Sequence, residues 1–553
     1  MSAAFLAILG WVAFFLGYRF YSRWIAKRIY RLRADAITPA HTYEDGIDYV
    51  PTNPFILWGH HFTSVAGAAP IVGPAIAVIW GWLPAFLWVI LGTIFIGGVH
   101  DFGALWASVR NQGRSIGSLT EDVVGRRARS LFMIIIFLLL LMVNAVFAVV
   151  IANLFVNYGS SILPAWSAIV VAVVIGYLLY RRGVGLLWPS LGGLAVLYLM
   201  VYLGDVLPFP QLSAPIWILL LFAYAFVASL LPVWLLLQPR DYINSLQLFL
   251  ALGLLYLAVL VANPTLVAPA FNFEVPADAP AIVPLLFVTI ACGAISGFHG
   301  LVSSGTSAKQ LDRETDARFV GYLGAVGEGA LALATILATT AGFASRAEWQ
   351  GFYQSFTSGG LSAFVQGGST ILNTGLGIPT SLATTLLAVI AVLFAGTTMD
   401  TAVRLQRYII EEWGQIYQLP ALTNRYLATS LAVVSCLILA FGAGGVAGTG
   451  GMTIWPLFGT TNQLLAALTL LVITVLLVKL ARPYWYTLVP LVFVLLMTVS
   501  SLLLQLGDFW SKQDYFLLGL DTLILVAAIW VVLEAAFVFN RARMEARIQK
   551  VID

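Results

Sequence analysis

The chain has 553 residues, of which 60% are hydrophobic and only 10% are charged. Soluble domains carry about 25% charged residues, so this composition excludes an ordinary water-soluble protein and indicates a membrane protein. The net charge of +3 at pH 7 follows the arrangement of the hydrophobic segments, and we do not interpret it as a sign of nucleic-acid binding.

Fifteen apolar stretches recur along the chain, and each is long enough to cross a bilayer as a helix of roughly 20 residues. They are 3–20, 62–80, 83–100, 131–157, 163–180, 185–206, 214–237, 243–262, 284–305, 320–343, 377–399, 426–443, 457–479, 484–505 and 517–539. A β-barrel would show shorter segments of alternating polarity. We therefore expect an all-α polytopic membrane protein with about 15 transmembrane helices.

The basic residues predict the orientation of these helices. The first stretch is followed by a basic cluster at 19–33 and has no preceding positive charge, so we expect a retained helix and not a cleaved signal peptide. Lys and Arg concentrate on the cytoplasmic side of membrane proteins. With strict alternation, all of the 28 Lys and Arg residues except Arg346 and Lys512 fall on one side. This predicts an outside N-terminus and a cytoplasmic C-terminus.

The order of the stretches also predicts internal symmetry. The second to sixth stretches form one block of five helices, and the seventh to eleventh form another. Because five is odd, the second block enters the membrane from the opposite face, as an inverted repeat requires. The expected divisions are 1–34 for an added N-terminal helix with its basic segment, 35–206 for the first repeat, 207–412 for the second, and 413–553 for the C-terminal helices.

The first helix of each block contains residues that interrupt helices. They are Gly67, Pro70, Gly73 and Pro74 in one, and Pro232 and Pro239 in the other. Proline removes a backbone donor and clashes with the preceding turn, so both helices should kink or unwind. Gly and Pro are also frequent in ordinary membrane helices, which is the alternative. Paired broken helices in matching positions point to a binding site at the middle of the membrane.

Backbone amides at the ends of broken helices attract anions. We therefore expect a small carboxylate-bearing solute to bind at these two interruptions. The candidate substrate-binding residues are Ala66, Gly67, Ala69, Pro70, Leu231, Pro232 and Trp234.

Ionisable residues inside a bilayer are costly and usually functional. The candidates for proton or cation coupling are His60, His61, His299, Glu328, Asp101, Asp241 and Asp400. Histidine changes charge near neutral pH, which suits a proton relay. The three aspartates have an alternative role as interfacial caps or partners of nearby arginines, and one of the two adjacent histidines has an alternative role in bonding a freed carbonyl group.

Hydroxyl and amide side chains form a further group. Ser303, Ser304, Thr306 and Ser307 are possible cation ligands, although such side chains also bond to their own helix. We expect Asn462 and Gln463 to bond neighbouring helices, and the glycine-rich segment 442–451 to be a flexible external approach. The sequence has no HExxH motif and no paired cysteine ligands, so we expect neither a metal site nor a cofactor.

Six stretches resemble the carbon starvation protein A family of bacterial membrane transporters. They are DGIDYVPTNPFILWGHHFTSVAGAAPIVGP (45–74), VHDFGALWASVRNQGRSIG (99–117), LPVWLLLQPRDY (231–242), SGFHGLVSSGTSAKQL (296–311), TTMDTAVRLQRY (397–408) and WPLFGTTNQLLAA (455–467). The resemblance implies a fold similar to the leucine-transporter fold, a bacterial inner-membrane location, and uptake of peptides or pyruvate with protons during nutrient limitation.

These observations together predict a secondary active transporter that imports a small nutrient by alternating access. Its expected partners are that solute, a proton or sodium ion, and the lipid bilayer. The alternatives are a passive facilitator or channel, a membrane nutrient sensor, and a membrane enzyme that uses the buried His, Glu and Asp residues.

Overall fold

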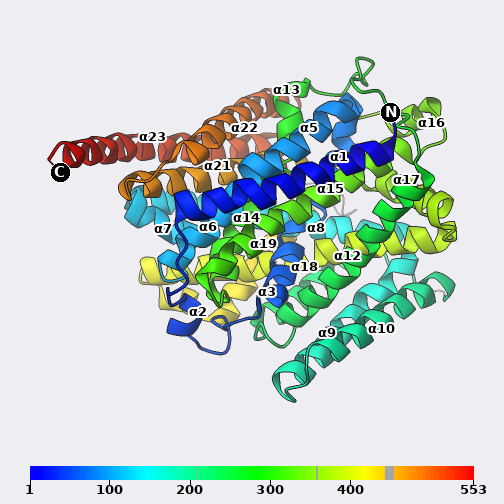
Figure 1. Cartoon of the computed structure of the whole chain (residues 1–553), viewed down its shortest axis with the longest axis horizontal. Coiled ribbons are helices and arrows are strands. Elements are labelled where there is room, and N and C mark those ends of the chain that lie inside the picture. The colour runs from blue at the N-terminus through cyan, green and yellow to red at the C-terminus, as the bar shows by residue number, and fades with distance from the viewer. Residues whose placement is uncertain (208, 357–358, 443–453, 553) are drawn as a thin grey trace.

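The computed structural model describes residues 1–207, 209–356, 359–442 and 454–552, and in this part of the chain the regular structure is helical (Figure 1). Two isolated β-bridges are present, Ser2 with Thr265 and Thr52 with Leu311. The expectation of an all-α membrane protein is confirmed. The predicted glycine-rich approach lies mostly at 443–453, outside the described residues.

The helices have the following bounds. In the first half they are α1 Ala3–Leu16, continued by π-helical turns at Gly17–Ser22 and Ile25–Tyr30, then α2 Pro39–Thr42, α3 Pro54–Ala66, α4 Ala69–Ala77, α5 Trp82–Gly92, α6 Gly98–Arg110, α7 Ile116–Val123, α8 Arg126–Asn157, α9 Ile162–Tyr180, α10 Leu187–Val206, α11 Ala214–Leu230 and α12 Leu237–Ala262. In the second half they are α13 Ile282–Thr289, α14 Gly297–Gly305, α15 Leu323–Ala341, α16 Arg346–Phe352, α17 Gly360–Leu376, α18 Thr380–Ile416, α19 Arg425–Gly442, α21 Trp455–Lys479, α22 Trp485–Ser511 and α23 Tyr515–Ile552.

Twelve helices among the described residues are long and apolar enough to cross a membrane, or thirteen if the bent pair α3–α4 counts as one span. Two other predicted stretches correspond to α11, which has 17 residues, and to the pair α13 and α14. The protein is therefore a multi-pass membrane protein. The exact number of crossings and their orientation stay predictions.

The first predicted interruption is present. Helix α3 ends at Ala66, α4 begins at Ala69, and the axes of the two helical segments differ by 46°. Gly67 has a φ of +56°, a left-handed conformation that glycine adopts readily. Pro70 lies in the first turn of α4, where its missing N–H removes no helical hydrogen bond.

The second interruption lies elsewhere than predicted. The stretch 284–305, expected as one continuous helix, is divided between α13 and α14 by the non-helical residues 290–296. By contrast, the segment 231–236 is a turn between two successive helices, α11 and α12. Pro232 lies in this turn and Pro239 in the first turn of α12, so neither interrupts a helix, because proline is tolerated at helix starts.

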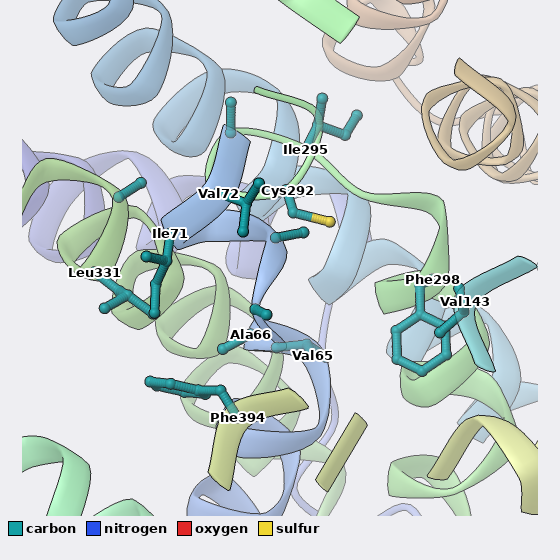
Figure 2. Packing of buried hydrophobic residues seen from close by; sticks show 14 of the residues in the cluster. Val65, Ala66, Ile71, Val72, Val143, Cys292, Ile295, Phe298, Leu331 and Phe394 are labelled. Carbon is teal, nitrogen blue, oxygen red and sulfur yellow. The ribbon is translucent and has the colours of Figure 1, made fainter. Parts of the chain in front are cut away.

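The two interruptions contact each other. A Cβ atom added to Gly73 of α4 would lie 2.3 Å from the carbonyl oxygen of Thr289, at the end of α13. One added to Gly293 would lie 3.6 Å from the Cα of Pro70. Figure 2 shows the same meeting point, where Val72 of α4 lies beside Cys292 and Ile71 points toward Leu331. The centre of the bundle therefore contains two discontinuous helices in direct contact.

We predict that Gly73→Ala destabilises the protein by about 1–3 kcal/mol, the usual cost of overpacking. The new methyl group has no room beside the Thr289 carbonyl group, which is backbone and cannot move aside. Thermal unfolding of purified protein in detergent would measure the effect. The control is Gly253→Ala in α12, where nothing lies within 4 Å of the added Cβ atom. An unchanged melting temperature for Gly73→Ala would contradict the close contact.

Candidate functional site

Two adjacent histidines on α3 face different parts of the bundle. His60 and His61 are both fully buried. Neighbouring side chains on a helix diverge by roughly 100°. Accordingly, His60 contacts α12, whereas His61 contacts the segment after α14 and the surface of α15. Each histidine belongs to a separate polar network.

The first network begins at His60. Its Nδ1 donates to Oδ2 of Asp241 across 2.6 Å, and both side chains are buried. Ser64, one turn further along α3, donates to the same carboxylate oxygen at 3.1 Å and lies 3.1 Å from the hydroxyl of Thr401 on α18. This part of the network connects α3, α12 and α18.

Arg240 is the central cation of the first network. Its Nε and Nη2 donate to Oδ1 of Asp241 at 3.1 and 2.7 Å. Its Nη1 forms an ion pair with Asp400 of α18 and donates to the hydroxyl of Tyr224 at 2.8 Å. Tyr224 in turn donates to Asp400 at 2.7 Å. Asp241 and Asp400 are therefore partners of an arginine, as the alternative proposed, but they lie inside the bundle and not at its interface with water.

The segment before α3 is held by a neighbouring set of charges. Asp48 accepts a hydrogen bond from Tyr408 at 2.5 Å and lies 3.5 Å from Nη1 of Arg404. Burial alone would raise the pKa of the Asp48 carboxyl group. A larger opposite effect comes from three nearby cations and a hydrogen bond, namely Lys309, Arg404, Arg407 and Tyr408, so the pKa lies below its usual range. Asp48 is therefore ionised at neutral pH and attaches this segment to α18.

The second network is centred on His299 of α14. His299 Nδ1 donates to Oδ2 of Asp101 at 2.8 Å, and His100 Nδ1 donates to the other oxygen of that carboxylate at 2.7 Å. On its other side, His299 Nε2 lies 3.2 Å from Oε1 of Glu328, within ion-pair range but without hydrogen-bond geometry. These four side chains are buried. The carboxyl group of Glu328 also lies beside the backbone of Gly293, inside the α13–α14 interruption.

His61 lies between this network and the end of α14. Its Nδ1 is 2.8 Å from the hydroxyl of Ser307. A Cβ atom added to Gly324 would lie 3.0 Å from its Nε2, which shows that the ring packs against α15 one turn before Glu328. Within the described residues, His61 Nε2 has no hydrogen-bond partner.

The four candidate cation ligands do not act as one group. Ser304 donates to the carbonyl of Gly300 at 2.7 Å, and Thr306 donates to that of Val302 at 3.0 Å. These are bonds within the same segment, the alternative expected from the sequence. Ser307 bonds to His61, and the Ser303 hydroxyl has no partner among the described residues.

The backbone at the two interruptions differs in its bonding. Ser296 precedes α14, and Asn462 of α21 accepts from the amide of Phe298 at 2.9 Å and donates to Ser296 at 2.9 Å. The prediction that Asn462 bonds a neighbouring helix is confirmed, and Gln463 does likewise through the Phe287 carbonyl. At the start of α4, no side chain caps the helix. The amides of Ala68 and Ala69 donate to no other residue in the described part of the chain.

Residues 231–234, expected beside the first interruption, lie in another region. The carbonyl of Leu231 accepts from Arg404 at 2.6 Å, the amide of Val233 donates to Ile47, and Arg181 lies over the ring of Trp234 at 5.2 Å. Pro232 is in the same turn. Leu231, Pro232 and Trp234 thus lie in the turn between α11 and α12. Their part in a substrate site with Ala66–Pro70 stays a prediction.

Several residues of these networks were not singled out from the sequence. They are Ser64, Tyr224 and Thr401. The only available signal was their polarity within apolar stretches, which does not distinguish them from residues that bond their own helix. Pairing across 160 to 340 positions of sequence becomes visible only in the fold.

We predict that Arg240→Gln destabilises the protein by about 3–5 kcal/mol, because breaking a buried ion pair leaves uncompensated charge. Asp241 and Asp400 would then lack their shared cation. The double variant Arg240→Gln with Asp400→Asn should recover a large part of the loss in a thermal unfolding assay. Arg313→Gln, at an exposed ion pair, is the control with little effect. A double variant no more stable than the single one would contradict the shared pairing.

The sequence is similar to a known protein family and to several of its members. The family model described as carbon starvation protein CstA matches residues 2–350 and 347–501. The chain is 34% identical over 564 residues to the peptide transporter CstA of Campylobacter jejuni, which covers 90% of this chain and 80% of that protein. It is 31% identical over 612 residues to the pyruvate/proton symporter BtsT of Escherichia coli K12, with coverages of 93% and 84%.

The fold is similar to that of solved transporters. A crystal structure of the Eremococcus coleocola manganese transporter matches with a TM-score of 0.51 at 14% identity, covering 90% of this chain and 99% of that one. This likeness concerns the fold alone and agrees with the expected similarity to the leucine-transporter fold. From the family match and the relatives, we conclude that this chain is a membrane transporter that belongs to the carbon starvation protein CstA family.

Proposed function

We propose that this transporter imports small carboxylate-bearing nutrients, peptides or pyruvate, together with protons and by alternating access. One observation carries the proposal. Two interrupted helices meet at the centre of the bundle, and the fully buried group of His299, Asp101 and Glu328 lies beside one of them. The names of the two relatives support the substrate classes and the proton.

The proposed substrate position is at the α3–α4 interruption, facing residues 290–296. Buried amides without partners are unfavourable, and amides at a helix start attract anions. The amides of Ala68 and Ala69 meet this description, whereas the start of α14 is already bonded by Asn462. Ala66, Gly67 and Pro70 shape the backbone that presents these amides.

The proposed proton route passes through the second network. His299 touches a carboxylate on each side, so a proton gained or lost by Glu328 changes the charge next to Gly293. A charge change beside a non-helical segment is the kind of local event that biases a two-state element. His61, which faces α15 from α3, is the proposed connection to the first interruption.

The first network has a proposed supporting part in coupling. Asp241 and Asp400 share the single cation Arg240, and His60 joins this network through Asp241. Sodium stays an alternative coupling ion, which the transport assay with separately imposed gradients distinguishes from the proton.

The proposed division into repeats starts the second repeat at α13 and not at residue 207. Each repeat then begins with an interrupted helix, α3–α4 or α13–α14. Packing supports this pairing. Helix α12 packs on α3 and α17, and its proposed counterpart α21 packs in the same way on α14 and α7. The proposed counterparts α8 and α18 pack against each other. The hairpin α9–α10 is then an insertion into the first repeat, which explains why its helices lie at the margin of the bundle in Figure 1.

A passive facilitator and a nutrient sensor are the alternative functions. Counterflow separates a carrier from a channel, since a channel shows none. Labelled pyruvate and labelled dipeptides should be supplied to proteoliposomes with the proton and sodium gradients imposed separately. If neither the proton gradient nor the sodium gradient drives accumulation, the proposed coupling is wrong.

We predict that Glu328→Gln, His299→Gln and His61→Ala each reduce proton-driven accumulation at least about tenfold, which corresponds to about 1.4 kcal/mol. Glu328→Gln should retain counterflow, because it removes a titrating group and leaves the interruptions in place. Glu44→Gln, an exposed loop substitution, is the matched control. Wild-type accumulation by well-folded Glu328→Gln and His61→Ala variants would rule out the relay.

A further inference from the structure

A large apolar groove lies on the outer surface of the bundle, between the π-helical turn Gly17–Ser22 that continues α1 and the helices α5, α13 and α22. Its volume is about 890 Å³, near the upper end of the range of about 300–1,000 Å³ that is usual for ligand pockets. Leu87, Leu91 and Val489 line it and are each more than two-fifths exposed. The groove therefore opens toward the hydrocarbon of the membrane.

The floor of the groove is an aromatic cluster. Trp88 of α5 packs edge-on against Phe287 of α13 with ring centroids 4.9 Å apart. Phe493 of α22 contacts both, at 5.6 Å from Trp88 and 5.1 Å from Phe287. The indole of Trp88 also donates to the carbonyl of Ile290 at 3.1 Å. The floor is thus attached directly to the α13–α14 interruption.

One end of the groove is aromatic and then basic. Tyr21 and Tyr486 line this end, and Trp24 lies against Tyr486 with ring centroids 4.4 Å apart. Trp and Tyr prefer the interface between hydrocarbon and headgroups. Arg28 follows Trp24 by about one helical turn and is exposed. This end is the one predicted to face the cytoplasm.

Arg482 strengthens the positive charge at this end. Its guanidinium donates to the carbonyls of Ile29 and Tyr30 at 3.2 and 2.7 Å, directly after Arg28. Burial lowers the pKa of Arg482, and the positive charges of Arg31, Arg110 and Arg33 lower it further. The nearby acid Glu314 is already paired with Arg110 at 2.7 Å. The region therefore has an excess of positive charge.

We propose that this groove binds one anionic glycerophospholipid, with an acyl chain on the Trp88–Phe287–Phe493 floor and the phosphate between Arg28 and Arg482. An apolar channel that ends in aromatic rings and then in cations matches the order of chain, glycerol and phosphate in such a lipid. The site is separate from the proposed substrate position. The bound lipid contacts α13 and so stabilises the arrangement in which α13 packs on α5 and α22.

Native mass spectrometry of the detergent-purified protein tests this site without requiring transport. The probes are palmitoyl-oleoyl phosphatidylglycerol and the matching phosphatidylcholine. The wild type should retain the anionic lipid about fivefold better, the order of effect of one basic side chain near an anionic headgroup. The double variant Leu91→Trp with Val489→Trp fills the groove and should abolish the retention. Arg28→Gln should lower the preference between the two lipids, because only Arg482 then remains beside the phosphate, and an unchanged preference would contradict the proposed headgroup position.

Matched controls separate a specific site from ordinary boundary lipid. Val170→Trp adds the same bulk at a 65% exposed position of α9, and Arg127→Gln removes an exposed charge outside the groove. Both should behave as the wild type, and excess inorganic phosphate should not displace the lipid. Equal retention of both lipids by the wild type, unchanged retention by the groove-filled variant, or displacement by phosphate alone would overturn the proposal.

Discussion

The structure depends on one constraint, which is that backbone polar groups inside a membrane must be bonded by protein. Non-helical backbone at that depth is tolerated only under this condition. The chain meets it for several of these groups with side chains from outside the interrupted helices, whereas the amides of Ala68 and Ala69 are left for a bound solute or water in the proposed site. Thr397 and Thr398 of α18 donate to the carbonyls of Thr63 and Ser64 at the end of α3. On the opposite interruption, Trp88 and Thr93 donate to the carbonyls of Ile290 and Gly293, and Asn462 accepts from Phe298. Side chains from three further segments therefore bond the backbone at the two interruptions.

The sequence predicted one interruption correctly and misplaced the other, for a physical reason. Gly67 and Pro70 mark the first, because a left-handed φ and a missing donor occur where the helix ends. The second interruption has no proline between 285 and 305. The residue that marks it is Gly293, which has a φ of +99° in the structure. Glycine is common in membrane helices, so its presence alone does not predict a break. Pro232 and Pro239 were the stronger signal by residue type, yet they occur at a turn and at a helix start, where proline costs nothing.

The charged residues could be predicted as individuals but not as pairs. Buried His60, His299, Glu328 and the three aspartates are unusual in any apolar stretch, and the sequence shows this directly. Their partners depend on how the helices pack. His60 bonds to Asp241, and His299 bonds to Asp101. Hydropathy and spacing contain no information about contacts across so many residues. The same limit explains why Tyr224 was missed and why the pairing of Asp400 with Arg240 was not predicted.

The adjacency of His60 and His61 has a mechanical consequence. The His60 ring bonds to Asp241 of α12, and the His61 ring bonds to Ser307 after α14. Helix α3 therefore links two polar groups on different sides of the bundle. A turn of α3 about its own axis cannot lengthen one of these contacts without altering the other. Insertion of a single residue between them would keep both imidazoles while changing their relative angle by roughly 100°, so the two hydrogen bonds could not both form without unwinding α3.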